Sequence, residues 1–152
     1  MKADDFFESV REAAVELERI ERRIDSMRSN LSGGGSGVAS TGGQRGDAHG
    51  MGKVDAAVDY EARMRPLLEQ DRRILDRACR VLYGDGNGGG VAKGIGNRYA
   101  EAVWHRALDA KTWKEVAAAC DASTSTVRRW YDISMDYIDA AGFDGAIAGE
   151  EV

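Results

Sequence analysis

Hydroxyl and guanidinium side chains crowd into the stretch from Ser123 to Arg129 of this 152-residue chain. A serine or threonine hydroxyl can hydrogen-bond a phosphate oxygen, and an arginine can place two N–H donors on the edge of a guanine. Together these side chains favour contact with a nucleic acid. The candidate DNA-binding residues are Lys114, Ser123, Thr124, Ser125, Thr126, Arg128 and Arg129.

Two short helices joined by a tight turn would hold these side chains. Thr112 and Glu115 have the spacing of a capping box, which predicts that a first helix begins there. Ser123 is a favoured N-cap residue and predicts the start of a second helix, with Val127 on its apolar face. Asp121, in the turn, tolerates positive φ better than most residues. The pattern predicts a helix-turn-helix with its second helix in the DNA major groove; the alternative is a helical hairpin that only packs.

A third helix, over residues 97–108, is expected to support the motif. Its apolar face predicts a small core shared by the three tryptophans, Trp104, Trp113 and Trp130. His105 falls outside that face and is expected to be exposed to solvent.

The charge distribution fits a DNA-binding segment better than the total charge does. The formal net charge is −5. However, residues 91–131 carry seven basic and four acidic side chains, whereas residues 132–152 carry six acidic side chains and no Lys or Arg. The basic excess therefore coincides with the motif, which predicts modest affinity and a steep dependence on salt.

The N-terminal part reads as a long helix over residues 3–31. Apolar residues recur at alternating spacings of four and three, which is a heptad seam. Either a second helix of the same chain or the same helix of another chain must cover this seam, so a homodimer through residues 6–31 is one alternative. The seam consists of Phe6, Val10, Ala13, Leu17, Ile20, Ile24, Met27 and Leu31.

The remaining segments complete an all-α prediction. Residues 32–52 are rich in Gly and Ser and predict a flexible linker. Residues 53–83 predict a helix, antiparallel to the first, with a kink or break near Pro66. The expected architecture is a coiled-coil-like helical hairpin over residues 1–83, followed by a tri-helical helix-turn-helix domain over residues 84–148.

Other classes of function find little support in the residues. No Ser/His/Asp, Cys/His or paired-carboxylate pattern with credible geometry is present, so no enzyme, catalytic residue, cofactor or metal is expected. The spacing Gly84-x-Gly86-x-x-Gly89 matches that of a dinucleotide-binding motif, but it follows a predicted helix rather than a strand. It therefore gives little support for nucleotide binding. No apolar run is long enough to span a bilayer, so we expect a cytoplasmic protein without membrane contact.

Several motifs together resemble one family of regulators. The pieces GVAK (90–93), RYA (98–100), TWKEVA (112–117), STSTVRRW (123–130) and DYIDAAG (136–142) look like phage and prophage transcriptional regulators of the ArpU/RinA type, whose helix-turn-helix is similar to region 4 of bacterial sigma factors. The resemblance covers roughly residues 54–143. It implies control of phage late genes through double-stranded DNA, with RNA polymerase as a further partner.

The leading hypothesis is therefore a sequence-specific DNA-binding transcriptional regulator of phage or prophage genes. One alternative is a phage small terminase subunit, which also joins a helix-turn-helix to oligomerisation helices but assembles as a ring. The other is a coiled-coil interaction protein that acts through the heptad seam.

Overall fold

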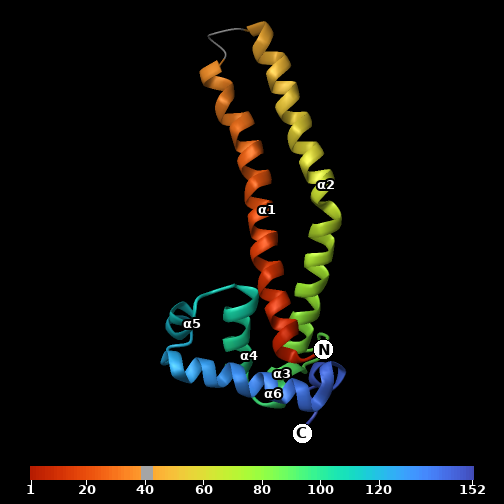
Figure 1. Ribbon diagram of the computed structural model, residues 1–152, viewed down its shortest axis with the longest axis vertical. Coiled ribbons are helices and arrows are strands. Elements are labelled where there is room, and N and C mark those ends of the chain that lie inside the picture. The colour runs from red at the N-terminus through yellow and green to blue at the C-terminus, as the bar shows by residue number, and fades with distance from the viewer. Residues whose placement is uncertain (39–42) are drawn as a thin grey trace. The chain divides into compact units, whose positions relative to one another are not determined.

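The computed structural model describes the backbone of residues 1–38 and 43–152 and the side chains of residues 1–29 and 55–152. Within these ranges the chain is helical and has no strand, which confirms the all-α prediction (Figure 1). The elements are α1 (Ala3–Val38), α2 (Gly43–Tyr83), α3 (Gly90–Gly94), α4 (Asn97–Val103), a π-helical turn η1 (Trp104–Leu108), α5 (Trp113–Ala119) and α6 (Thr124–Ala148).

The chain divides into two compact units. We call Met1–Val15 with Asp71–Val152 the helix-turn-helix unit, and Glu16–Gln70 the hairpin unit. The division differs from the predicted boundary at residue 83, because the start of α1 and the end of α2 belong to the helix-turn-helix core. Phe7, Val10 and Leu82 are fully buried there, in one cluster with Ile138 of α6.

In the hairpin unit, α1 and α2 run antiparallel and bury the middle of the predicted heptad seam (Figure 1). Ile20 and Ile24 form a cluster with Leu68 of α2, and Leu17 and Met64 pack against its edge. The same-chain alternative therefore accounts for these seam residues, so no second chain is needed to cover them.

Both long helices extend beyond their predicted ends. The backbone is helical up to Val38 and again from Gly43, which leaves residues 39–42 of the predicted linker outside the described backbone. Adding a residue to an existing helix is far easier than nucleating a new one, so a long helix can continue into a weak sequence. The break expected at Pro66 does not occur: α2 continues through this residue. Proline removes a single hydrogen bond from the ladder, and Pro66 is exposed to solvent.

Close backbone approaches hold the short helices on α6. A Cβ atom added to Gly94, at the end of α3, would lie 2.2 Å from the Tyr137 hydroxyl oxygen. That hydroxyl donates to the Glu150 carbonyl at 2.7 Å, so Tyr137 has little freedom to move. Gly142, with φ 78°, bends α6 and lets its last turns, which include Phe143, return to the core.

Candidate nucleic-acid interface

The first helix of the motif begins with the predicted capping box. The Glu115 N–H donates to the Thr112 hydroxyl oxygen at 3.3 Å, and the Thr112 N–H donates back to the Glu115 carboxylate at 3.1 Å. The hydrogen bonds from Thr112 lower the pKa of Glu115, because they favour the charged carboxylate. The start of α5 is therefore defined by two adjacent local interactions.

The turn between α5 and α6 has the predicted left-handed residue. Asp121 has φ 50°, and the N–H of the next residue, Ala122, donates to the Ala117 carbonyl at 3.0 Å. Ser123 then caps α6, since its hydroxyl oxygen accepts the Thr126 N–H at 3.2 Å. Local side-chain chemistry thus fixes the sharp change of direction between the helices.

Packing between α5 and α6 sets which face of α6 points outward. Val127 is fully buried against Val116 and Ala117, and Trp130 packs on the edge of this cluster. Val127 therefore lies on the apolar face of its helix, as predicted, and fills the space between the two helices together with Trp130. Successive residues on a helix turn by about 100°, so Ser125 and Arg129 point away from the side that carries Val127.

Most of the predicted binding residues are accessible. Lys114, Ser123, Thr124, Ser125, Arg128 and Arg129 are exposed. Thr126 differs from the prediction because it is half-buried and accepts a hydrogen bond from the Ser123 hydroxyl at 2.8 Å. The N-cap therefore uses Thr126 internally, which leaves six accessible residues from the predicted set.

The two adjacent arginines have different surroundings. The Arg128 guanidinium lies over the Trp113 ring, 5.3 Å from its centre, and Arg106 lies over the same ring at 4.5 Å. Arg129, one residue further, has no such ring contact among the described residues. On the other side of α6, Arg98 lies over the Trp130 ring at 5.8 Å. Stacking restricts where a guanidinium can reach, so of the two adjacent arginines Arg129, which is exposed, is the less restricted donor.

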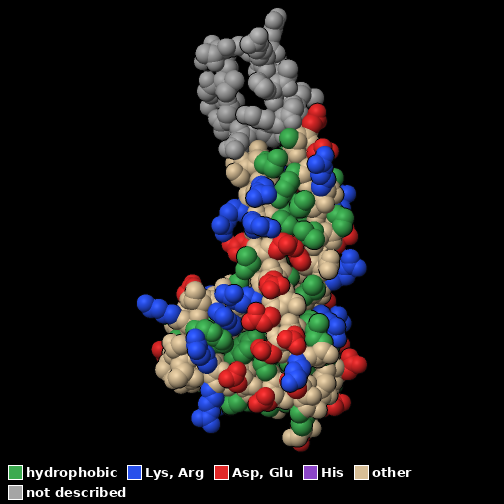
Figure 2. Space-filling view, in the orientation of Figure 1, with side chains coloured by type: hydrophobic (Ala, Val, Ile, Leu, Met, Phe, Trp, Pro, Cys, Tyr) green, Lys and Arg blue, Asp and Glu red, His purple; other side chains and the backbone are tan. Residues whose placement is uncertain are grey.

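Charge changes sign along α6. Figure 2 shows Lys and Arg side chains gathered over α5 and the beginning of α6, while Asp and Glu side chains follow along the rest of α6. The exposed acids on the later turns include Asp132, Asp136 and Asp139. Because these carboxylates repel phosphate, only the first turns of α6 suit a close approach to DNA.

The three tryptophans do not form the single small core that was predicted. Each is partly buried and pairs edge-to-face with a tyrosine instead, namely Trp104 with Tyr83, Trp113 with Tyr131 and Trp130 with Tyr99, at ring separations of 5.4 to 6.4 Å. Helical spacing shows that each ring lies on the apolar side of its own helix. It does not identify the residues of other helices that the ring contacts.

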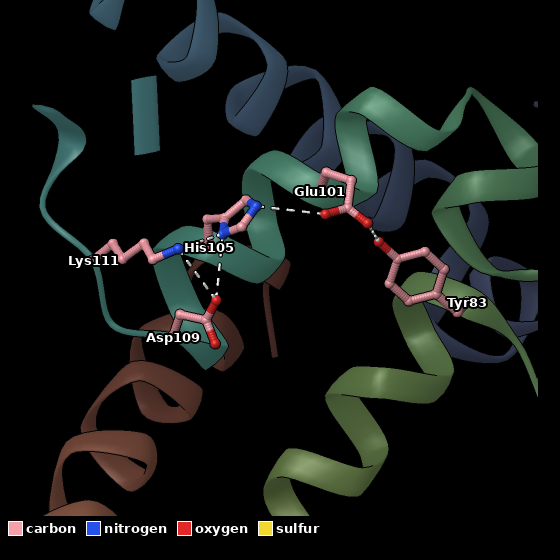
Figure 3. A network of polar contacts seen from close by, with 5 residues as sticks. All are labelled: Tyr83, Glu101, His105, Asp109 and Lys111. Atoms are coloured by element: carbon pink, nitrogen blue, oxygen red, sulfur yellow. Dashed lines mark hydrogen bonds and ion pairs between the residues drawn. The ribbon is translucent and has the colours of Figure 1, made fainter. Parts of the chain in front are cut away.

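His105 is also placed differently from the prediction. Only 19% of its side chain is exposed, because it lies in the π-helical turn η1, where the wider turn shifts residues relative to α-helical spacing. Figure 3 shows His105 between two carboxylates, with Nε2 3.5 Å from Glu101 and Nδ1 3.3 Å from Asp109. Lys111 lies 2.9 Å from the same Nδ1. This network braces the turn that leads into α5.

Two basic residues outside the predicted DNA-binding set also lie next to the motif. Arg106 donates to the Lys111 carbonyl at 3.0 Å, and Arg11 of α1 approaches the Ala110 carbonyl at 3.4 Å. Both therefore lie beside the start of α5. The charge count of residues 91–131 included Arg106, but no sequence signal connected Arg11 to this site, because 99 positions separate it from its contact at Ala110.

Comparison with known proteins adds no relative: no family model, curated protein or solved structure matches this chain. Within the described residues, no helix combines the length and the apolar character that a bilayer span requires.

Proposed function

We propose that this protein binds double-stranded DNA in a sequence-specific manner and regulates transcription. The first two turns of α6 enter the major groove, Ser125 and Arg129 face the base edges, and Lys114 and the Thr124 hydroxyl contact the backbone, while the Ser123 hydroxyl stays in the cap with Thr126. Arginine on guanine is the commonest specific contact in this groove.

One observation carries the proposal: Val127 is fully buried between α5 and α6 while Ser125 and Arg129 stay exposed on the opposite face. A helical hairpin that only packs has no need for an exposed cationic face opposite a buried anchor. The change from basic to acidic residues along α6 further favours insertion of its N-terminal end over contact along its whole length.

The test begins with selection of bound sequences from a random DNA library, followed by titration of the best site at several salt concentrations. We expect Arg129→Ala to weaken specific binding by about 1–3 kcal/mol, roughly 5- to 150-fold, and to relax the preference at one base pair. The matched control is Arg19→Ala, which removes an exposed arginine from the hairpin unit. Absence of binding at low salt, or equal behaviour of the two variants, overturns the proposal.

The biological setting follows from the resemblance to phage regulators of the ArpU/RinA type. On that basis we propose phage or prophage genes as the targets, RNA polymerase as a further partner and the cytoplasm as the location. The small terminase alternative requires a ring, so the mass in solution discriminates it from a monomer or dimer. Because α2 covers Ile20 and Ile24 in the hairpin unit, a homodimer through residues 6–31 is the less economical assembly.

A further inference from the structure

Three arginines from separate parts of the chain contact residues 110–113, at the start of α5. Arg106 comes from η1 and Arg128 from α6, and both lie over the Trp113 ring. Arg11, from the first turns of α1, reaches the Ala110 carbonyl just before α5. All of these residues belong to the helix-turn-helix unit.

The positive charges at this site have no carboxylate partner in the described part of the chain. Among the side chains that the structure describes, none of these three guanidiniums forms an ion pair with a carboxylate. Burial lowers the pKa of Arg106 most, followed by the like charge of Arg11; Tyr131 and Glu8 raise it, and the lowering by Arg128 is the smallest effect. The Nε atom of Arg11 is buried and has no hydrogen-bond partner among the described residues. Arg11 and Arg106 are half-buried and Arg128 is exposed, so a bound anion would reduce the repulsion among the three charges.

The donors suit one kind of anion. Each guanidinium has five N–H donors, and the carbonyl contacts of Arg11 and Arg106 use one donor each. Planar guanidiniums match the paired oxygens of a phosphate, and stacking on Trp113 holds two of them in place before a ligand arrives. A phosphate bound at this position would belong to the DNA backbone that borders the groove which Arg129 faces.

We propose that Arg11, Arg106 and Arg128 together bind one backbone phosphate of the DNA strand beside α5. This inference rests on the proposed DNA-binding function. It assigns different roles to the adjacent arginines: Arg128 binds the DNA backbone and positions the protein, whereas Arg129 contacts a base. It also gives the start of α1 a direct part in DNA binding.

The experiment combines arginine variants with neutral phosphates. A single methylphosphonate is moved along both strands of the selected site, and affinity is measured for the full-length protein, Arg106→Gln and Arg11→Gln. For the unmodified protein, one position should reduce affinity by about tenfold or more. The same modification should have little further effect on either variant, because the contact is already lost.

Two further measurements separate this site from a structural or unspecific effect. Arg106→Gln combined with Arg11→Gln should lower the slope of log affinity against log salt by about 0.9, the value for one phosphate, and leave the base preference unchanged. Arg77→Gln is the matched control, since Arg77 stacks on Phe6 and Phe143 without contacting α5. It should retain full sensitivity to the methylphosphonate. Arg106→Lys keeps the charge and should retain the salt slope, which separates loss of the site from loss of the fold.

The possible failures are distinguishable. If Arg129→Ala loses specific binding but both Gln variants still respond to every methylphosphonate as the unmodified protein does, the DNA-binding function stands and the arginine site is wrong. A slope change of about 1.8 or more for the double variant indicates separate phosphates and overturns the shared site. Binding of inorganic phosphate that Arg106→Gln abolishes, without any effect of that variant on DNA affinity, assigns the cluster to a small anion and also overturns it.

Discussion

Replacement of Val127 by alanine tests the packing on which the whole interface depends. Val127 is fully buried between α5 and α6, against Val116 and Ala117. The substitution removes two methyl groups at about 0.8 kcal/mol each, and the cavity left behind adds roughly 1 kcal/mol. We therefore expect a loss of about 2–3 kcal/mol in the free energy of unfolding, or a melting temperature lower by roughly 5–10 °C.

Thermal and urea unfolding are monitored by circular dichroism and by tryptophan fluorescence. Val58→Ala is the matched control, because it makes the same chemical change in α2 at a side chain that is 61% exposed. This control also includes the small gain in helix propensity from valine to alanine, and it should stay within about 0.5 kcal/mol of the unmodified protein. The tryptophan signal should respond to Val127→Ala in particular, since Trp113 and Trp130 pack on the same cluster.

Equal stability of the two variants would refute the reasoning. In that case α6 would not be anchored by Val127, and the outward orientation of Ser125 and Arg129 would lose its physical basis. A large loss for Val127→Ala together with unchanged specific DNA binding at low temperature is consistent with the proposal, because the folded fraction still presents the same face.

Three further predictions concern the elements around the interface. Thr112→Ala should destabilise the protein by about 1 kcal/mol in urea unfolding, and Thr112→Ser should restore most of the loss, since it keeps the capping hydroxyl. Because the pKa of Glu115 is lowered in the folded state, its carboxylate stabilises the fold above the ordinary value of 4.5, and this contribution disappears as pH falls through the lower folded value. The stability difference between the unmodified protein and Glu115→Gln should accordingly shrink below pH 4.5, and a difference that stays constant in acid contradicts this. Gly94→Ala should cost roughly 1–3 kcal/mol in thermal unfolding, since its Cβ meets the buried Tyr137 hydroxyl; an unchanged melting curve would show that this approach can relax.

Much of the motif could be predicted from the sequence because its determinants are local. The capping box joins Thr112 and Glu115, three positions apart, and the second cap joins Ser123 to the N–H of Thr126 in the same way. Asp121 takes its left-handed conformation from the turn itself. Such interactions depend on the spacing of a few residues, and that spacing is visible in the chain without any tertiary structure.

The differences arose where tertiary neighbours or an unusual turn decided the outcome. His105 lies in the π-helical turn and is half-buried beside Lys111 and its own i,i+4 neighbours Glu101 and Asp109, although its place outside the apolar face predicted exposure. The tryptophans share faces as expected, yet each pairs with a tyrosine that periodicity could not identify. Periodicity reports which side of a helix is apolar, but it carries no information on which residue of another helix lies opposite.

The sequence by itself determined the capped starts of α5 and α6, the turn between them and most of the accessible residues at the start of α6. Only the tertiary structure distinguished Arg128, stacked on Trp113, from Arg129, which is exposed and has no such ring contact among the described residues. Only the fold brought Arg11 to the same site as Arg106, because the first turns of α1 pack in one core with the C-terminal helices. Local hydrogen bonds follow from neighbouring residues, whereas the convergence of charges depends on how buried apolar surfaces join distant segments.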